Sequence, residues 1–326
     1  MHGKKMDSFW LFVMAGTFVF ILIIGMIIFN DSNEMVSGDD PVPGFDDEFI
    51  ELDINTPVTF PLQDALNIVN TNAIITDLEN ISYNPDLGES HPDDETSEYQ
   101  PNYKLVEDKY LCETFWVINK NNNNLEIHVN AENGEINQVS NVIMTSGTLS
   151  KQAAIDQAQS IITAFAPTLG TLTPDYVSYT NLTEHDISEN LEVATGYVIE
   201  YYRFVQGVNT TDKIHIEIDS SGNIVSFIKI WNLEMPLSLI PQISSEIALE
   251  TLNTYFNDTG NPYQTSLMVV RPNYLYEGEG PRYGFNNGIL AWVFEYEYTF
   301  TDNNEIKNYF LGCFVDANEN EIIGGY

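Results

Sequence analysis

Three stretches of this chain repeat one pattern, and that repeat constrains the fold more than any other feature. Each stretch opens with an amphipathic helix pattern marked by Ala followed by Leu or Ile, and closes with a β-hairpin pattern. The helix marks are Ala65-Leu66, Ala154-Ile155 and Ala248-Leu249, and the hairpins are Ile127–Ile136, Ile216–Val225 and Cys313–Ile322. From the helix Ala to the turn residue the spacing is 69 residues (65 to 134), 68 (154 to 222) and 72 (248 to 320). Such spacing predicts one supersecondary unit used three times.

The helix of the second stretch has the clearest boundaries. Ser150 is a candidate N-cap, and Pro167 and Gly170 end the apolar period. The predicted buried stripe is Ala154, Ala158, Ile161, Ile162 and Phe165. The first four of these residues lie 4, 8, 11 and 12 positions after Ser150. At the same distances after Ser244, the third stretch has Ala248, Leu252, Tyr255 and Phe256. We therefore expect the same helix face to be buried in both stretches.

The strands of the second stretch alternate between apolar and polar residues. In the segment 212–231, Ile214, Ile216 and Ile218 alternate with polar side chains that include His215. A period of two predicts one face buried and one in water. His128 holds the matching place in the first stretch, so both histidines are predicted to be surface residues, with metal ligation as the alternative.

The N-terminal part of the chain contains a long apolar segment. Phe9 to Phe29 carries no charge and, at 1.5 Å per residue, would reach about 31 Å, enough to cross a bilayer core. The alternative is a cleavable signal peptide, but the following residues, NDSNEMVSG, fit a cleavage site poorly. Lys4 and Lys5 precede the segment and the next base after it is Lys104, which predicts a cytoplasmic N-terminus.

Together these patterns predict an α+β protein. Its predicted fold is an N-terminal transmembrane helix followed by three repeated units of one helix packed on a short antiparallel sheet. The predicted parts are a cytoplasmic tail 1–8, a transmembrane helix 9–29, an acidic stalk 30–56, and units 57–142 (with a mobile loop at 84–100), 143–235 and 236–326. The predicted location is the cell membrane, as a single-pass protein with its C-terminal domain extracytoplasmic.

The charge balance excludes some partners. The chain has 48 acids against 12 bases, a net charge of −36. A nucleic-acid reader needs clustered Lys and Arg, so no nucleic-acid partner is expected. Docking on anionic lipid is disfavoured for the same reason.

The strand patterns resemble tandem PepSY-type domains. The segment YVIEYYRFVQGV followed by IHIEIDSSGNIVSFIKIW, within 197–231, fits that family best. Residues 110–136 fit moderately, and residues 290–323 fit with Asn320 in place of the turn glycine. The resemblance covers 57–326 and implies extracytoplasmic, non-catalytic modules. Such modules occur in propeptides of thermolysin-type metalloproteases and in membrane-anchored accessory proteins of bacterial sensor kinases.

No sequence motif supplies a catalytic set. The chain has no His-Glu-x-x-His, no Gly-x-Ser-x-Gly and no phosphate-binding Gly-x-x-x-x-Gly-Lys. No catalytic or cofactor-binding residue is therefore predicted, and no cofactor. A weak Ca²⁺ candidate is formed by Asp316, Asn318 and Asn320, whose spacing resembles the start of a calcium loop. The alternative for this segment is an ordinary hairpin turn.

Two covalent modifications are candidates in an extracytoplasmic setting. Cys112 and Cys313 could form a disulfide between the first and third stretches, or remain two buried thiols. Candidate glycosylation sites are Asn80, Asn181, Asn209 and Asn257, although such triplets also arise by chance.

These observations predict a membrane-anchored extracytoplasmic binding or regulatory protein that is not an enzyme. Its expected partner is a protein or peptide, such as a membrane sensor or a secreted peptidase, bound by surface complementarity or by strand addition at an open sheet edge. The alternatives are a structural component of the cell envelope and an unrecognised extracellular hydrolase.

Overall fold

The computed structural model describes residues 49–79, 103–108, 111–120, 124–141, 144–182, 195–256, 260–272, 287–302 and 305–325. Its helices are α2 (Leu62–Thr71), α3 (Ala73–Glu79), α4 (Lys151–Phe165), the 3₁₀ turn η3 (Pro167–Leu169) and α5 (Ser245–Tyr255). Its strands are β1 (Phe49–Leu52), β2 (Tyr103–Asp108), β3 (Glu113–Lys120), β4 (Leu125–Asn130), β5 (Ile136–Asn141), β6 (Tyr176–Asn181), β7 (Thr195–Val205), β8 (Val208–Asp219), β9 (Ile224–Ile230), β10 (Gln264–Val270), β11 (Ile289–Asp302), β12 (Glu305–Asp316) and β13 (Ile322–Gly325).

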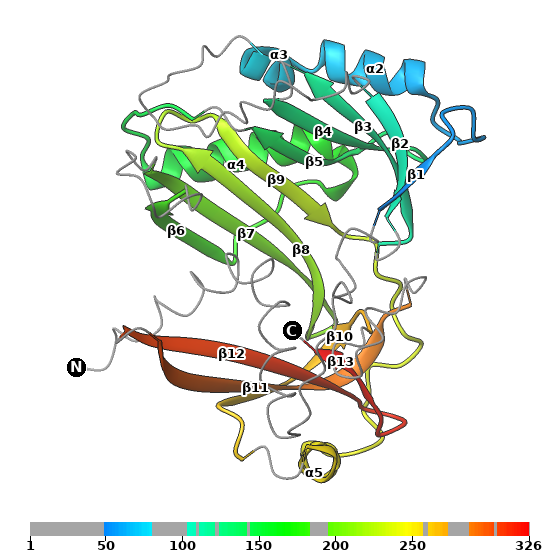
Figure 1. The fold of residues 1–326 in the computed structure, drawn as a ribbon, viewed down its shortest axis with the longest axis vertical. Helices are drawn as coiled ribbons and strands as arrows, with labels where there is room; N and C mark the ends of the chain where they lie inside the picture. The colour runs from blue at the N-terminus through cyan, green and yellow to red at the C-terminus, as the bar shows by residue number, and fades with distance from the viewer. Residues whose placement is uncertain are drawn as a thin grey trace, which may run out of the picture. The chain divides into compact units, whose positions relative to one another are not determined.

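The chain divides into two compact units. The larger unit consists of Asp47–Val205 and Thr210–Leu233. Among the described residues, the smaller unit consists of Gln206–Asn209 and those after Leu233. Each unit is built around its own group of strands and helices (Figure 1).

The larger unit is a sheet with helices on one face. Its strands lie in the order β1-β2-β3-β4-β5-β9-β8-β7-β6, with antiparallel pairing from β1 through β9 to β8 and between β6 and β7. Helices α2, α3 and α4 contribute to one buried apolar cluster with one face of these strands (Figure 1). This cluster is the main core of the unit.

Strand periodicity explains which side chains enter that core. Trp116 and Ile118 of β3 pack in the cluster beneath the helices, whereas Phe115 and Val117 belong to a smaller cluster on the other face. All five predicted stripe residues of α4 are buried. Its N-cap, Ser150, accepts a hydrogen bond from the backbone N–H of Ala153 at 3.3 Å, as expected for a capping hydroxyl.

The smaller unit pairs β10, β11, β12 and β13 in antiparallel order. Helix α5 buries Ala248 and Leu252 against a cluster that includes Phe294 and Val315. Tyr255, however, is 51% exposed, so the stripe predicted from the offsets of α4 is wrong at this position. Because α5 ends at Tyr255, that side chain lies in the last turn rather than mid-helix, and the next residue, Phe256, packs against the cluster instead.

The predicted fold class is wrong. Among the described residues, strands β1 to β9 form one sheet in the larger unit and β10 to β13 pair in the smaller unit, so the strands do not form three short sheets each covered by one helix. The pairing of β5 with β9, through Gln138↔Ile228, Val139↔Phe227 and Ser140↔Ser226, joins the predicted units 57–142 and 143–235. The physical reason is backbone hydrogen bonding. Separate short sheets would leave the edges of β5 and β9 unpaired, and pairing the two strands provides partners for the backbone groups along both edges.

Several predicted parts lie outside the described residues. They are the segment 9–29, most of the stalk and the loop 84–100. Among the residues that the structure does describe, none of the helices has the length and apolarity to cross a membrane.

Candidate functional site: the β6 edge and the polar face beside it

Strand β6 forms one edge of the sheet in the larger unit. It pairs with β7 from Tyr176↔Glu200 to Asn181↔Thr195. Among the described strands, β7 is its one neighbour. In an antiparallel ladder only alternate residues bond to a given neighbour, so about half of the backbone N–H and C=O groups of β6 face away from β7. The Nζ atom of Lys151 donates to one of its carbonyls, that of Val177, at 3.4 Å.

The sequence of β6 lacks the usual protection of an edge strand. Its six residues, YVSYTN, contain no charge and no proline. Strand β1, at the opposite edge, carries Glu51, which is exposed. Natural edge strands usually carry charges, proline or bulges that prevent pairing with another chain. The β6 edge therefore has the composition of a strand that can accept a further strand.

An aromatic pair extends from β6 onto β7. The rings of Tyr179 and Tyr197 are 5.0 Å apart and tilted by 63°, an edge-to-face contact. The Tyr179 hydroxyl donates to Thr195 Oγ1 at 2.7 Å, yet its side chain is 55% exposed. Tyr179 thus offers a fixed, half-exposed aromatic surface beside the open edge.

The face of the sheet turned away from α4 carries a buried polar cluster next to β6. Glu200, which is paired directly with Tyr176, places Oε1 3.3 Å from His215 Nδ1 and accepts from the Tyr202 hydroxyl at 2.7 Å. The second ring nitrogen of His215 lies 3.1 Å from Glu217 Oε1. Both ring nitrogens therefore face carboxylates, an arrangement that suits the imidazolium cation.

The pKa values in this cluster follow from burial opposed by pairing. Burial lowers the pKa of His215, but hydrogen bonds to Glu200 and Glu217 outweigh it and raise the pKa above its ordinary value. Burial raises the pKa of Glu200, but hydrogen bonds from His215 and Tyr202 leave it below its ordinary value. Burial and the Glu200 charge raise the pKa of Tyr202, so its hydroxyl stays protonated.

A second group of polar contacts fixes the ends of these strands. Asp175, just before β6, accepts from the backbone N–H of Tyr202 at 2.8 Å. Asp212, fully buried, accepts from Arg203 Nη1 at 2.8 Å, and the same nitrogen donates to the Leu233 carbonyl at 2.9 Å. These contacts fix β7, the neighbour of the edge strand, and β8, the next strand of the sheet.

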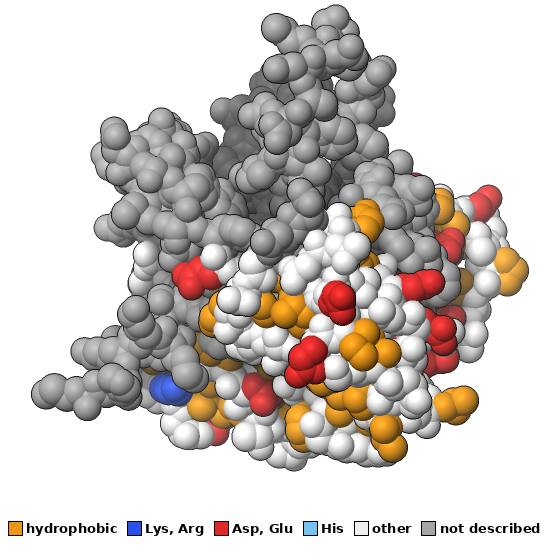
Figure 2. Space-filling model, turned by 90° about the horizontal axis from the view of Figure 1, so that it is seen from below, with side chains coloured by type: hydrophobic (Ala, Val, Ile, Leu, Met, Phe, Trp, Pro, Cys, Tyr) orange, Lys and Arg blue, Asp and Glu red, His pale blue; other side chains and the backbone are white. Residues whose placement is uncertain are grey.

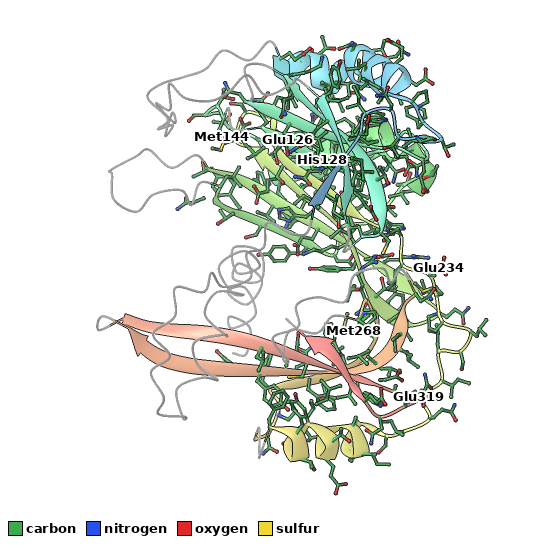
Figure 3. The ribbon with its side chains drawn as sticks, turned by 45° about the vertical axis from the view of Figure 1, so that its right-hand side comes forward. Glu126, His128, Met144, Glu234, Met268 and Glu319 are labelled. Atoms are coloured by element: carbon green, nitrogen blue, oxygen red, sulfur yellow. The ribbon has the colours of Figure 1, made fainter. Side chains whose placement is uncertain are left out.

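The prediction that His128 and His215 are surface residues is wrong. His215 is 3% exposed and His128 is 7% exposed. Both lie on the expected face, but neighbouring side chains cover them. Glu126 and His128 lie close together in Figure 3, and Glu126 Oε1 is 2.8 Å from His128 Nε2. The hydrogen bond to His128 lowers the pKa of Glu126. The sequence did carry a signal for this burial. Each histidine has a glutamate two residues away, Glu126 for His128 and Glu217 for His215, and residues two apart share one face of a strand.

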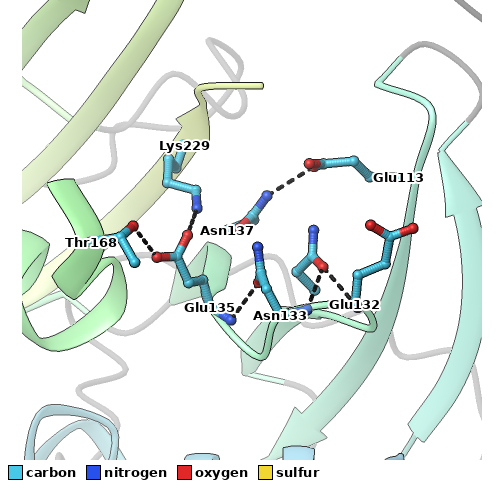
Figure 4. A network of polar contacts seen from close by, with 8 residues as sticks. Glu113, Glu132, Asn133, Glu135, Asn137, Thr168 and Lys229 are labelled. Carbon is cyan, nitrogen blue, oxygen red and sulfur yellow. Dashed lines mark hydrogen bonds and ion pairs between the residues drawn. The ribbon is translucent and has the colours of Figure 1, made fainter. Parts of the chain in front are cut away.

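A polar network on the helix face joins β9 to the β4–β5 turn (Figure 4). Lys229 Nζ lies 2.5 Å from Glu135 Oε2, and the Thr168 hydroxyl of η3 donates to the other oxygen of Glu135. Nearby, Asn137 Nδ2 donates to Glu113 Oε2 at 3.0 Å. The Glu135–Lys229 pair spans the junction at which β5 meets β9.

The Ca²⁺ candidate residues form a hairpin turn. Asp316 Oδ1 accepts from the backbone N–H groups of Asn318 and Glu319 at 2.7 and 3.1 Å. Asn320 has a φ of 59° and its Oδ1 accepts from Thr251 Oγ1 at 2.9 Å. These oxygens thus have hydrogen-bond donors from the protein itself. No group of three or more His, Cys, Asp or Glu able to hold a metal occurs within the described residues.

The corresponding turns elsewhere in the chain have the same construction. Asn130 Oδ1 accepts from the N–H groups of residues 132 and 133, and Asp219 Oδ1 accepts from those of residues 221 and 223. Gly134 and Gly222 take the positive φ that Asn320 takes in the third turn. This similarity supports the hairpin interpretation of all three segments.

The two cysteines lie in different units. Cys112 is half-buried before β3 with a φ of 54°, and Cys313 is buried in β12. The disulfide between them stays a prediction. Of the four candidate glycosylation sites, Asn181 and Asn209 are exposed, at the end of β6 and near the start of β8. Asn80 and Asn257 lie outside the described residues.

A shallow groove of about 430 Å³ lies at the start of α2. It is lined by residues between Ile54 and Gln63 and by Trp116, and none of these lining side chains titrates. In the polar cluster, the carboxylates engage both nitrogens of His215, so in this arrangement neither nitrogen faces a nucleophile. Within the described residues of the larger unit, the edge of β6, which pairs with β7 alone, is therefore the feature best suited to binding.

Comparison with known proteins identifies no family. No family model and no curated protein sequence matches the chain. Among solved structures, the Bacillus megaterium YpeB C-terminal domain matches with a TM-score of 0.36 and 14% sequence identity. The match covers 83% of this chain and 98% of that chain. A likeness at this level is loose and does not identify a function, and the resemblance to PepSY-type domains stays a prediction.

Proposed function

We propose that this chain is a membrane-anchored extracytoplasmic protein of non-enzymatic type that binds and modulates a protein partner, either a membrane sensor or a secreted peptidase. The observation that supports binding is the edge of β6, which carries no charge, no proline and an exposed tyrosine. An extended segment of the partner would add beside β6, because main-chain hydrogen bonds give affinity in this mode and alternate side chains give specificity.

Two features beside β6 would shape that recognition. Side chains on one face of an added strand would lie beside Tyr179. Those on the other face would lie beside Tyr176, which is paired with Glu200. The chain carries a net charge of −36, so an added segment with Lys or Arg at alternate positions is favoured over an acidic one.

The test uses the full chain in nonionic detergent and a labelled ten-residue peptide that alternates Val and Lys. We expect saturable binding by fluorescence anisotropy, and a loss of at least tenfold when alternate backbone nitrogens of the peptide are methylated. Ser178→Lys, which places a charge on the edge strand, should also weaken binding at least tenfold. The matched control is Thr171→Lys, an equal charge at an exposed position of the same unit outside the strands.

Three results would contradict the proposal. Equal binding of the methylated peptide would exclude strand addition. An equal loss with Thr171→Lys would show that only overall charge matters. Self-association that requires Ca²⁺, with no peptide binding, would favour a structural component of the cell envelope instead.

A further inference from the structure

The smaller unit exposes large apolar side chains within one short part of the chain. Nine large hydrophobic residues of the described chain are exposed, and five of them fall between residues 237 and 263. Those five are Leu237, Ile240, Ile247, Tyr255 and Tyr263. Single exposed apolar residues are ordinary, and the occurrence of five within one short stretch singles this stretch out among the described residues.

Leu237 and Ile240 protrude from a segment that is held at both ends. At its start, the Glu234 carbonyl accepts from the Gly288 N–H at 2.7 Å. At its end, the Ala317 carbonyl accepts from the N–H groups of residues 242 and 243 at 2.8 and 3.1 Å. Leu237 is fully exposed and Ile240 is 70% exposed. A segment fixed in this way presents the two side chains at a lower entropic cost than a free loop would.

Local chemistry within the segment restricts it further. Pro236 and Pro241 fix their own φ angles and limit the residues before them. The Ser238 hydroxyl accepts from the Ile240 N–H at 3.2 Å, which forms a short side-chain turn between the two protruding residues. Leu237 and Ile240 are therefore presented three residues apart on a restricted backbone.

Helix α5 adds a second apolar element. Its buried residues, Ala248 and Leu252, face the sheet, whereas Ile247 and Tyr255 are exposed. The Tyr255 ring packs edge-to-face on Phe256 at 4.8 Å, so it is held in place although it is exposed. We call Leu237, Ile240 and the exposed residues of α5 the α5 surface.

The α5 surface is acidic as well as apolar. Residues 230–270 contain no Lys, Arg or His. Glu234, Glu246 and Glu250 are exposed within this stretch. Figure 2, which views the molecule from the α5 side, shows carboxylates spread among apolar side chains, and Figure 3 shows Glu234 and Glu319 pointing outward.

We propose that the α5 surface docks a second protein surface that is apolar at its centre and rimmed by Lys or Arg, independently of the β6 edge. Charge complementarity decides between occupants. A second copy of this chain would bring a further net charge of −36, and an anionic membrane would repel the glutamates. A basic protein surface satisfies both the exposed apolar side chains and the carboxylates around them.

The test uses the full chain in phosphatidylcholine nanodiscs, with empty nanodiscs as reference. The probe is a twelve-residue peptide of Leu and Lys at helical spacing. Leu237→Ser combined with Ile240→Ser should weaken binding at least tenfold, because two anchoring aliphatic side chains are lost. Ile50→Ser combined with Ile54→Ser is the matched control, since both residues are exposed aliphatics of the larger unit, and it should change binding less than twofold.

Two further peptides and one lipid arm make the outcome decisive. A Leu–Glu peptide should bind at least ten times more weakly than the Leu–Lys peptide. If a Ser–Lys peptide binds as tightly as the Leu–Lys peptide, the apolar side chains play no part and the proposal fails. If the nanodisc-bound chain instead co-floats with phosphatidylcholine vesicles in a manner that the Leu237 and Ile240 changes abolish, the surface binds lipid and the proposal is overturned.

Discussion

The ion pair between Glu135 and Lys229 should stabilise the junction at which β5 meets β9. That junction has three residue pairs in register, so few ladder hydrogen bonds hold it. The side chains of Lys229 and Glu135 are only 7% and 12% exposed, and their charged atoms lie 2.5 Å apart. We expect this pair to contribute more than a surface salt bridge, which is typically worth about 0–1 kcal/mol.

A double-mutant cycle measures the contribution. Lys229→Met leaves the Glu135 carboxylate with Thr168 as its remaining side-chain donor, and we expect a loss of about 2–4 kcal/mol of unfolding free energy. Glu135→Gln leaves a nearly buried ammonium without its counter-charge and should cost about 1–3 kcal/mol. Because the double variant removes both charges, its cost should fall short of the sum by about 1–3 kcal/mol.

The assay is urea unfolding of the full chain in detergent, followed by intrinsic tryptophan fluorescence, to which Trp116 and Trp231 of the larger unit contribute. The measurement should be repeated at low pH. Burial raises the pKa of Glu135, but the hydrogen bonds from Lys229 and Thr168 leave it below its ordinary value of 4.5. The coupling is therefore present above pH 4.5 and lost as the pH falls through the folded pKa. A coupling below about 0.5 kcal/mol at neutral pH would refute the argument.

Three further predictions concern β7 and its surroundings. The pKa of His215 is raised from 6.5 and that of Glu200 is lowered from 4.5, so the free energy of unfolding should be greatest between pH 4.5 and pH 6.5. It should fall above them as His215 loses its proton and below them as Glu200 gains one, and in urea midpoints His215→Gln should remove the alkaline loss. Gly196→Ala should cost about 1–3 kcal/mol in the same assay, because the added Cβ would lie 2.1 Å from the Ile218 carbonyl oxygen. Tyr201→Phe should raise stability by about 1 kcal/mol, since the Tyr201 hydroxyl is buried without a hydrogen-bond partner among the described residues.

Local periodicity predicted helix α4 well. The buried residues from Ala154 to Phe165 were expected because an apolar period of 3.6 can be recognised within one segment, and the cap at Ser150 and the stop at Pro167 are local signals too. The alternation around Ile216 also identified the core face of β8. Patterns of this kind depend on residues close in sequence, so they are available before the fold is known.

The joining of the strands could not be predicted in the same way. Pairing of Val139 with Phe227 connects residues far apart in the chain, and no local pattern specifies which strand edges meet. The same limit explains His215. Alternation placed it on the correct face, but Glu200 comes from a neighbouring strand, and its carboxylate helps to bury the ring. Sequence patterns assign a face, whereas burial depends on what the neighbouring strands carry.

The open edge of β6 raises the question of why copies of this chain would not pair with one another. Strand edges without charge are prone to self-association. The net charge of −36 offers an answer, because repulsion between copies opposes contact while leaving the edge open to a cationic segment. Salt should weaken this protection, since the Debye length falls from about 8 Å at 0.15 M to about 3 Å at 1 M. Sedimentation of the full chain in detergent should therefore show dimers at high salt that Ser178→Lys removes and Thr171→Lys retains. A chain that stays monomeric at both salt concentrations would show that β6 is closed to strand addition by another copy.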